Sequence, residues 1–386
     1  NRVPQFSFEV IRAADAPGLP VIARDLQGVA LIPGSGEYAL ATTQVNYAWG
    51  YGKYESANVN TAADVADFAV SLEAMEGELP NCGAVSLIVS WFGDDLRVGQ
   101  CSVKPKVEQK QADGGNMPWR VAGLTRSSAE QLTQVEGRAV YGGTPTDQSV
   151  IEAIAALNAA GQEVMFYPFL LMEILEGSGK PDPWADTGDQ PALPWRGRIT
   201  GEKAPGIAGS PDGTAAADAE VDAFFGSASA SDFSVAAGAV SYSGPAEWSY
   251  RRFVLHNAAL CAAAGGVESF CIGSEMRSLT QLRGTDGFPA VDQLIDLAAE
   301  VRALLPDAKL SYAADWSEYF GYHPQDGSGD VYFHLDPLWA DANIDFIGID
   351  NYMPLSDWRE GRDHADIGWR SIYELDYLQA NIEGGE

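Results

Sequence analysis

The chain has 386 residues, 46% of them hydrophobic and 20% charged, which is typical of a globular protein and allows one large barrel or two to three domains. Its formal net charge of −30 repels phosphate backbones and no basic stripe offsets it, so we expect no direct nucleic-acid binding and ascribe the acidity to solubility or a salty habitat. No apolar run is long enough to span a membrane, so no membrane span is predicted.

The ends and the cysteines give further expectations. The chain opens on Asn1 without an initiator Met or a leader, which predicts a piece of a longer polypeptide or a processed chain. Cys261 and Cys271 lie in apolar runs and are predicted to be buried, whereas the spacing leaves open whether Cys82 and Cys101 form a disulfide. No Cys/His cluster has zinc spacing, so no structural metal is expected.

The first part of the chain has the residue pattern of short β-strands. Short runs across residues 1–60, with period-two alternation at Phe6, Phe8 and Val10, predict a small β-rich lead-in. At Thr61 the residue pattern becomes helical, and Thr61 is a residue type that caps the start of a helix. We therefore divide the chain into a lead-in, 1–60, and a second domain, 61–386.

Strands and helices alternate through the second domain. The continuous apolar run at 84–89 is typical of a strand buried on both faces. A stretch at about 172–245, rich in Gly, Pro, Ala, Ser and Asp, is predicted to be a long insertion that carries one short helix. The other predicted strands cover 163–170, 267–273, 308–314 and 344–350, and the predicted helices cover 147–160, 247–264, 289–305 and 369–382.

This alternation predicts parallel βαβ units in an α/β fold, either a doubly wound sheet or a (β/α)8 barrel. No G-x-G-x-x-G or P-loop motif supports a nucleotide-binding doubly wound sheet. Several strands instead end in acids and aromatics, as at the active-site face of a barrel. We therefore favour the TIM-barrel-like fold. The residues at these strand ends are Trp91, Tyr167, Glu275, Asp315, Trp316, Asp350, Asn351 and Tyr352.

Carboxylates beside aromatic rings suit carbohydrate, because glycoside hydrolysis needs two carboxyl groups and rings stack on sugars. Glu275 ends the apolar strand of "GVESFCIGSEM", where it is either a catalytic acid or an ordinary acid at a helix start. Asp315 and Trp316 are interpreted as facing the sugar. Asp350 and Asn351 either bond substrate or form a turn, and Tyr352 favours the former.

Other polar residues are interpreted structurally. Asp94 and Asp95 are expected to be a loop pair, and His323 and His334, which flank a turn-like segment, are not expected to be catalytic.

Long motifs carry a family resemblance. "VSLIVSWFGDD", "MFYPFLLMEI", "PWRGRIT", "FCIGSEMRSLT" and "IDFIGIDNYMPLSDW" together resemble the TIM-barrel-like domain of gene transfer agent tail proteins, the large "megatron" baseplate proteins of phage-like particles. The likeness covers about residues 60–386. The opening "NRVPQFSFEV" is similar to hub-type segments of phage tail-tip proteins.

The resemblance implies specific roles. The barrel of this family resembles a glycoside hydrolase clan with one catalytic glutamate at strand 4 and one at strand 7. Glu275 matches the strand-4 acid, and Ser274 stands where the clan usually places an Asn that holds the sugar 2-hydroxyl. No residue matches the strand-7 nucleophile, and a closed barrel needs two strands after 344–350. We therefore expect a fragment that is inactive alone. The implied substrate-binding residues are Trp91, Tyr167, Ser274, Asp315, Trp316, Asp350, Asn351 and Tyr352.

Three functions follow. The first is a baseplate component, assembled in the bacterial cytoplasm into an extracellular particle tail, whose barrel contacts or trims cell-surface polysaccharide or peptidoglycan. Its protein partners would be other tail proteins, the hub and the distal tail protein. The second is a stand-alone glycoside hydrolase, and the third is a non-catalytic structural barrel. None of them calls for a cofactor.

Overall fold

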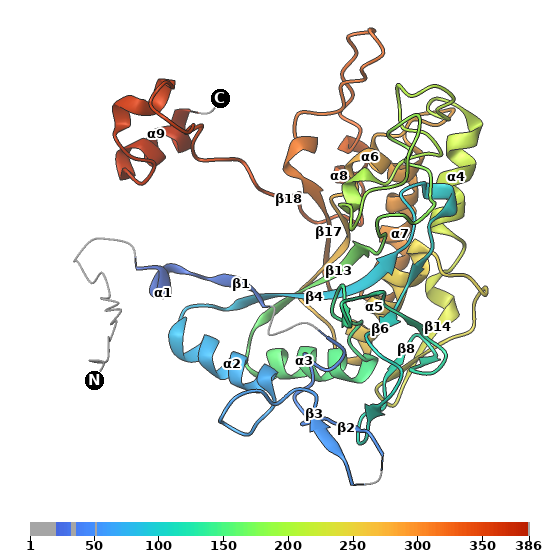
Figure 1. Cartoon of the computed structure of the whole chain (residues 1–386), viewed down its shortest axis with the longest axis vertical. Helices are drawn as coiled ribbons and strands as arrows, with labels where there is room; N and C mark the ends of the chain where they lie inside the picture. The colour runs from blue at the N-terminus through green and yellow to red at the C-terminus, as the bar shows by residue number, and fades with distance from the viewer. Residues whose placement is uncertain (1–20, 32–35, 51, 385–386) are drawn as a thin grey trace, which may run out of the picture.

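The computed structural model describes residues 21–31, 36–50 and 52–384, and its centre is a curved parallel sheet (Figure 1). Six parallel strands lie side by side in chain order, as in the first three quarters of an eight-stranded α/β barrel. They are β1 (Gly28–Leu31), β4 (Ala84–Gly93), β13 (Glu163–Met172), β16 (Ser269–Ser274), β17 (Lys309–Asp315) and β18 (Gly348–Asp350). This order confirms the TIM-barrel-like fold and places the "FCIGSEM" strand fourth.

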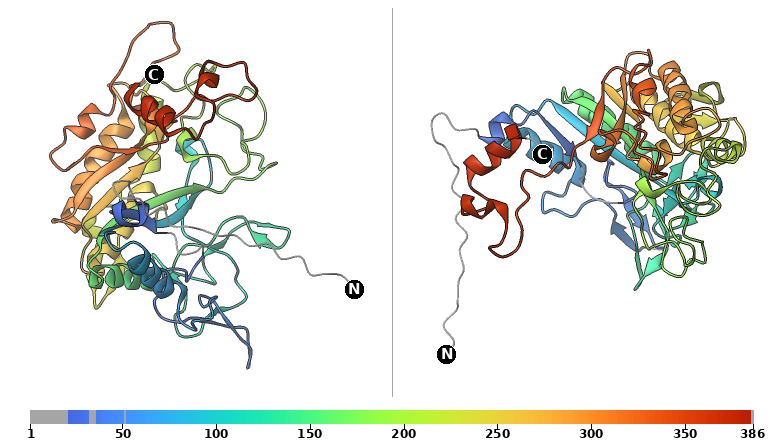
Figure 2. Two further views of the ribbon diagram at one scale, coloured as in Figure 1. Left: turned by 90° about the vertical axis from the view of Figure 1, so that its left-hand side faces the viewer. Right: turned by 90° about the horizontal axis from the view of Figure 1, so that it is seen from above.

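Helices cover the outer face of this sheet (Figure 2). The largest apolar cluster lies between the two layers and takes side chains from both, because alternate strand residues point outward toward the helices. The covering helices are α2 (Asp67–Glu78), α3 (Asp147–Ala159), α5 (Tyr250–Ala263), α7 (Pro289–Leu304) and the short α8 (Asp336–Trp339). A second, small cluster of Tyr167, Cys271 and Ala313 lies on the opposite, inner face.

The strand β4 differs from its prediction. Val85, Leu87 and Val89 are buried beneath the helices, whereas Ser86 and Ile88 on the inner face are only partly buried. The six parallel strands do not close around an interior, so the inner face of β4 is not fully covered. The apolar run therefore forms the predicted strand without being buried on both faces.

The helix boundaries follow local chemistry. In α3 the predicted apolar stripe is buried at Val150, Ile154 and Leu157, and Gly161 with φ 77° ends the turn that follows. The helix predicted from Thr61 begins only at Asp67, because Asp64 has a left-handed φ of 54°.

The predicted domain boundary does not separate the sheet from the lead-in. Strand β1 pairs with β4 in parallel, Gly28 opposite Ala84, so the barrel sheet begins before residue 61. The rest of the described lead-in contributes α1 (Ile22–Asp25) and two strands, β2 (Asn46–Ala48) and β3 (Tyr54–Ser56), of a small antiparallel sheet. The alternation at Phe6–Val10 lies outside the described residues.

Two long connections, one after β4 and one after β13, are inserted between elements of the barrel. The one after β4 carries only a 3-10 turn, η1 (Val98–Gln100), and short strands: β5 (Val103–Lys104), β6 (Lys106–Val107), β7 (Asp113–Gly114), β8 (Arg120–Val121), β9 (Leu124–Thr125), β10 (Glu130–Gln131), β11 (Gln134–Val135) and β12 (Arg138–Ala139). The predicted insertion after β13 carries η2 (Arg196–Arg198), the predicted helix α4 (Ala215–Phe225), η3 (Ala230–Asp232) and a hairpin that was not predicted, β14 (Phe233–Ala236) with β15 (Ala239–Tyr242).

The remaining elements follow the sheet strands. Helix α6 (Arg277–Thr280) follows β16, η4 (Trp316–Glu318) follows β17, and η5 (Ala365–Trp369) and α9 (Leu375–Gly384) close the described chain. All four cysteines are free, so Cys82 and Cys101 are not joined, and Cys261 and Cys271 are buried as predicted. Among the described residues, no helix is long and apolar enough to cross a membrane.

Candidate functional site

Glu275 leaves the end of β16 in an unusual backbone conformation. Its φ is 48°, in the left-handed region that side-chain-bearing residues rarely adopt. Two contacts with β17 hold it there. The Glu275 N–H donates to the Ala313 carbonyl at 2.8 Å, and the Tyr312 hydroxyl accepts from the Met276 N–H at 2.7 Å. Strained residues of this kind cluster at functional sites, where the surrounding structure must enforce them.

Two donors from the insertion meet the Glu275 carboxylate. The Trp195 indole N–H lies 2.7 Å from Glu275 Oε2, and Arg196 Nη2 lies 3.0 Å from the same oxygen. Glu275 is only 6% exposed and Arg196 only 5%, so this ion pair is largely removed from water. Burial of both charges makes each depend on the other.

Arg196 is itself fixed by neighbouring strands. Its Nε donates to the Ser274 carbonyl at 2.9 Å and to Ser274 Oγ at 3.2 Å, and its guanidinium stacks 3.9 Å from the centre of the Phe169 ring. Ser274, expected to bind substrate, therefore serves here as an acceptor for Arg196.

A second carboxyl group lies next to Glu275. Asp350, at the end of β18, accepts a hydrogen bond of 2.5 Å from the Tyr167 hydroxyl. Burial, and then the charge and hydrogen bond of Glu275, raise the pKa of Asp350 to about 6, although Tyr167 and Arg196 oppose the shift. Two adjacent carboxyl groups resist simultaneous ionisation, so the pair retains one proton to about pH 6.

The tyrosines around this pair feel the same charges. Burial and then the hydrogen bond to Asp350 raise the pKa of Tyr167, and the charge of Glu275 is the main cause that raises the pKa of Tyr352. Both phenols therefore stay neutral and can donate hydrogen bonds. The arrangement offers a carboxylate, a protonated carboxyl and phenol hydroxyls in one place, which suits hydrogen bonding to hydroxyl-rich ligands and proton transfer.

The structure brings four of the predicted residues together, Tyr167, Ser274, Glu275 and Asp350, and Tyr352 lies within electrostatic reach of them. Ser274 and Asp350 end β16 and β18, Glu275 directly follows β16, and Tyr167 lies within β13.

Three other predicted residues take part in local turns or stand at the rim. Asp315 caps η4 by accepting from the Ser317 N–H at 3.0 Å, and Trp316 begins that turn with its side chain partly exposed. Asn351 is exposed and accepts from the Met353 N–H at 2.9 Å, which is the turn that the sequence left as an alternative.

The prediction for Trp91 is wrong. Its side chain is 1% exposed and packs on the helix side of β4 against Trp248 and Phe253, with ring centres 5.9 Å and 5.3 Å away. The strand continues two residues beyond Trp91, so the residue lies within the outer core and is closed to a ligand.

Sequence reasoning assigned no role to Trp195 or Arg196. They belong to the "PWRGRIT" motif of the insertion, whose concentration of aromatic and basic residues is the signal that could have found them. Their partner Glu275 lies about eighty positions later, and nothing in the local pattern joins the two.

The described part of the chain holds no group of three or more His, Cys, Asp or Glu side chains that could bind a metal ion. The predicted loop acid Asp95 pairs with Arg97 at 2.9 Å. His334 is buried, with its Nε2 3.2 Å from Thr280 Oγ1. Neither joins the Glu275 cluster.

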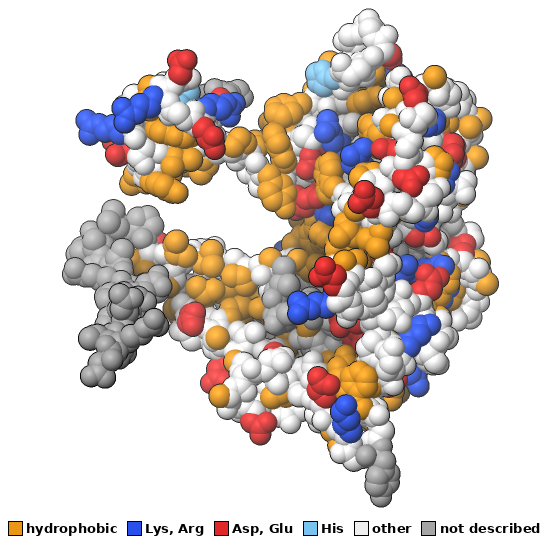
Figure 3. Space-filling model, in the orientation of Figure 1, with side chains coloured by type: hydrophobic (Ala, Val, Ile, Leu, Met, Phe, Trp, Pro, Cys, Tyr) orange, Lys and Arg blue, Asp and Glu red, His pale blue; other side chains and the backbone are white. Residues whose placement is uncertain are grey.

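The open side of the sheet is visible as a hollow in Figure 3, lined largely by hydrophobic side chains. Sheet edges at β1 and β18 face this hollow (Figure 1).

Residues 248–386 match the family model described as the GTA TIM-barrel-like domain. No curated protein sequence matches the chain. Among solved structures, a GH113 β-1,4-mannanase complex is 16% identical, with 83% of this chain and 63% of that chain covered and a TM-score of 0.38. A GH113 β-mannanase from Alicyclobacillus acidocaldarius in complex with ManMIm is 15% identical, with 92% and 69% covered and a TM-score of 0.39. The chain thus spans less than two thirds of the length of the first of these enzymes.

Proposed function

From the GTA TIM-barrel-like domain in residues 248–386, we propose that this chain is a tail or baseplate component of a gene transfer agent particle. We further propose that its barrel binds a cell-envelope polysaccharide of the host during DNA delivery. The observation that carries the second proposal is the carboxyl pair Glu275 and Asp350, which lies at the carboxyl end of the sheet beside Trp195 and Tyr167.

Each part of this cluster suits a sugar. The Trp195 ring is 39% exposed and offers a face for stacking, while the carboxyl and phenol groups accept and donate hydrogen bonds to hydroxyls. Glu275 remains the residue we propose for catalysis. The neighbouring Asp350, whose pKa is raised to about 6, supplies a proton for a leaving glycosidic oxygen.

Hydrolysis needs more than this pair. Besides burial, the charge of Glu275 raises the pKa of Asp350, so the two groups are close neighbours, whereas a glycosidase uses two carboxyl groups that flank the scissile bond. We propose binding for residues 1–386, and hydrolysis only for a barrel that also presents a carboxylate on its seventh strand.

One observation favours a non-catalytic barrel as the second candidate. Trp195 and Arg196 both contact Oε2 of Glu275, and the buried Arg196 forms an ion pair that a substrate would have to accommodate. In that case Glu275 would stabilise the fold through these two contacts and would take no part in a reaction.

Co-sedimentation with insoluble host-envelope polysaccharide tests the binding proposal. We expect the unmodified chain to sediment with it and Glu275→Gln to lose most of this binding. Glu268→Gln is the matched control, because Glu268 is exposed at the opposite end of the β16 region, where its carboxylate pairs with Lys309. Equal sedimentation of all three proteins would remove Glu275 from the binding site.

Two further measurements separate the remaining roles. Release of reducing sugar by the full-length protein, lost in Glu275→Gln, would support hydrolysis, and its absence would leave the non-catalytic candidate. Mass spectrometry of purified particles tests the tail assignment, which is contradicted if the chain is absent from them.

A further inference from the structure

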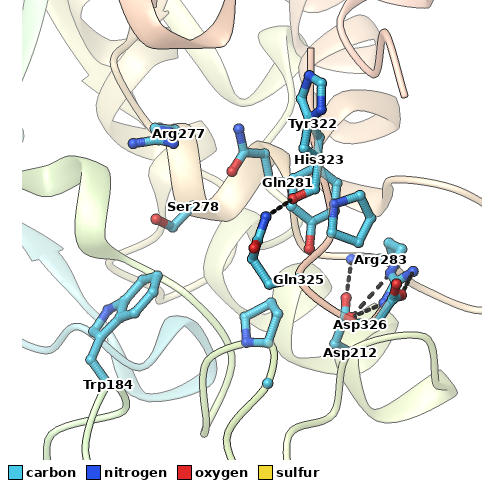
Figure 4. Close-up of a pocket in the computed structure, with 13 residues that line it drawn as sticks. Trp184, Asp212, Arg277, Ser278, Gln281, Arg283, Tyr322, His323, Gln325 and Asp326 are labelled. Atoms are coloured by element: carbon cyan, nitrogen blue, oxygen red, sulfur yellow. Dashed lines mark hydrogen bonds and ion pairs between the residues drawn. The ribbon is translucent and has the colours of Figure 1, made fainter. Parts of the chain in front are cut away.

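A separate pocket lies beside the short helix α6, with a volume of about 290 Å³ (Figure 4). Its walls come from the insertion, from α6 and from the loop that follows η4. The side chains that line it include Trp184, Arg277, Ser278, Gln281, Tyr322 and Gln325.

The aromatic walls of this pocket are held in place. The Trp184 indole N–H donates to the Arg198 carbonyl at 2.8 Å, which fixes the plane of the ring. Tyr322 is 9% exposed and its ring packs against Phe288 and Tyr332. Rigid aromatic faces bind a flat apolar surface at low entropic cost, and the faces of pyranose rings provide one.

Polar groups without protein partners also line the pocket. Within the described chain, the side chains of Ser278, Gln281 and Arg277 make no hydrogen bond or ion pair, although Gln281 is only 9% exposed. The Gln325 amide N–H₂ donates to the His323 carbonyl at 3.0 Å and leaves its oxygen free. A ligand with hydroxyl or acetamido groups would give the Gln281 amide the hydrogen-bond partners that the protein does not supply.

The charges in the walls largely cancel. Arg283 pairs with Asp212 at 2.6 Å and with Asp326 at 3.1 Å, which leaves one net negative charge on this side of the pocket for the positive charge of Arg277 to balance (Figure 4). Arg277 adds one free guanidinium, a donor suited to the oxygens of a sugar. Aromatic faces, amides and hydroxyls around a nearly neutral space favour an uncharged sugar unit.

We propose that this pocket is a second sugar subsite, which holds a neutral hexose or N-acetylhexosamine unit of the glycan that contacts Glu275. Two links in the chain connect the sites. Arg277 and Ser278 follow Glu275 by two and three residues, and the insertion supplies Trp184 to the pocket and Trp195 to the Glu275 cluster. This subsite rests on the proposed polysaccharide binding and narrows its ligand to an uncharged glycan.

Isothermal titration with cellohexaose, mannohexaose and chitohexaose, and with the matching disaccharides, tests the subsite. We expect Trp184→Ala to weaken hexaose binding about tenfold and to leave disaccharide binding at Glu275 unchanged, because only the longer ligand reaches the pocket. Gln281→Ala, a smaller change that keeps the Trp184 wall, should weaken the hexaose several-fold. Trp49→Ala, at an exposed tryptophan on the β2–β3 hairpin, is the control and should change neither.

The outcomes separate this subsite from the proposed function. Hexaose binding that is lost in Glu275→Gln but unchanged in Trp184→Ala and Gln281→Ala would overturn the subsite alone. Hexaose binding that depends on Trp184 but not on Glu275 would support a sugar site in the pocket and overturn the glycan path to Glu275. Failure of the unmodified protein to bind any of the probes would contradict the subsite for neutral glycans.

Discussion

At the scale of single residues, the site is defined by one buried oxygen. Oε2 of Glu275 receives both Trp195 and Arg196, and the backbone at Glu275 adopts a left-handed φ to bring the carboxylate there. The neighbouring Asp350 carries the raised pKa. The proton therefore resides on Asp350, which faces a phenol and the charge of Glu275. Glu275, in contrast, faces a guanidinium and an indole N–H.

Removal of the guanidinium tests the ion pair. Arg196→Met should lower the free energy of unfolding by about 3 kcal/mol, because it leaves the Glu275 carboxylate buried without its cation. Urea denaturation measures the change. The double variant Arg196→Met/Glu275→Gln should recover part of the lost unfolding free energy. If its loss instead equals the sum of the losses in the two single variants, the two side chains do not interact.

The raised pKa of Asp350 gives a pH dependence with a defined sign. The folded pKa of about 6 exceeds the unfolded value of about 4, so the folded state binds the extra proton between these values and this contribution to stability falls as pH rises through 4 to 6. Asp350→Asn still accepts from Tyr167 but cannot ionise. It should therefore have a higher Tm than the unmodified protein at pH 8, and this advantage should disappear near pH 4. An equal Tm difference at both pH values would contradict the shifted pKa.

At the scale of elements, the sequence predicts the barrel strands from apolar runs and their helices from the 3.6-residue stripe. It counted β16 as the fourth strand and β18 as the sixth, which the sheet order confirms. It placed the β-type run that contains β1 in the lead-in and not in the barrel sheet, because four residues do not show which sheet a strand joins. It also misplaced Trp91, because β4 continues two residues past Trp91 and the two-residue period of the strand turns this side chain to the helix side with Val85, Leu87 and Val89.

The close packing behind Glu275 gives a test at this scale. A Cβ added to Gly273 would lie 2.5 Å from the Tyr250 hydroxyl, which is held by the Ile272 carbonyl at 3.1 Å. Gly273→Ala should therefore destabilise the protein by about 1–3 kcal/mol and disturb the end of β16. Gly83→Ala, before β4, meets no atom within 4 Å and is the control. Equal unfolding midpoints for the two variants would show that β16 is less tightly packed here.

At the scale of the whole molecule, the sheet is an arc of six parallel strands with the short antiparallel β5 added to β4, its described edges are β1 and β18, and the Glu275 cluster lies near its carboxyl end. The contacts that complete this cluster join the insertion to β16 and β13 to β18, over separations of 80 and 183 residues. No local sequence pattern encodes contacts over such separations. Glu275, Tyr167 and Asp350 could therefore be predicted as site residues, but their proximity could not, and Trp195 and Arg196 were assigned no role. The family resemblance, in contrast, was carried by long motifs and agrees with the domain match at 248–386.

The central claim is that a glycan binds at the Glu275–Asp350 pair. A crystal structure of the chain with a bound hexaose that the protein retains in solution tests it most directly. The account predicts a sugar ring over the Trp195 face, with a hydroxyl oxygen about 3 Å from a carboxyl oxygen of Glu275 or Asp350. Sugar density confined to another part of the surface, with Glu275 still bonded only to Trp195 and Arg196, would contradict the claim.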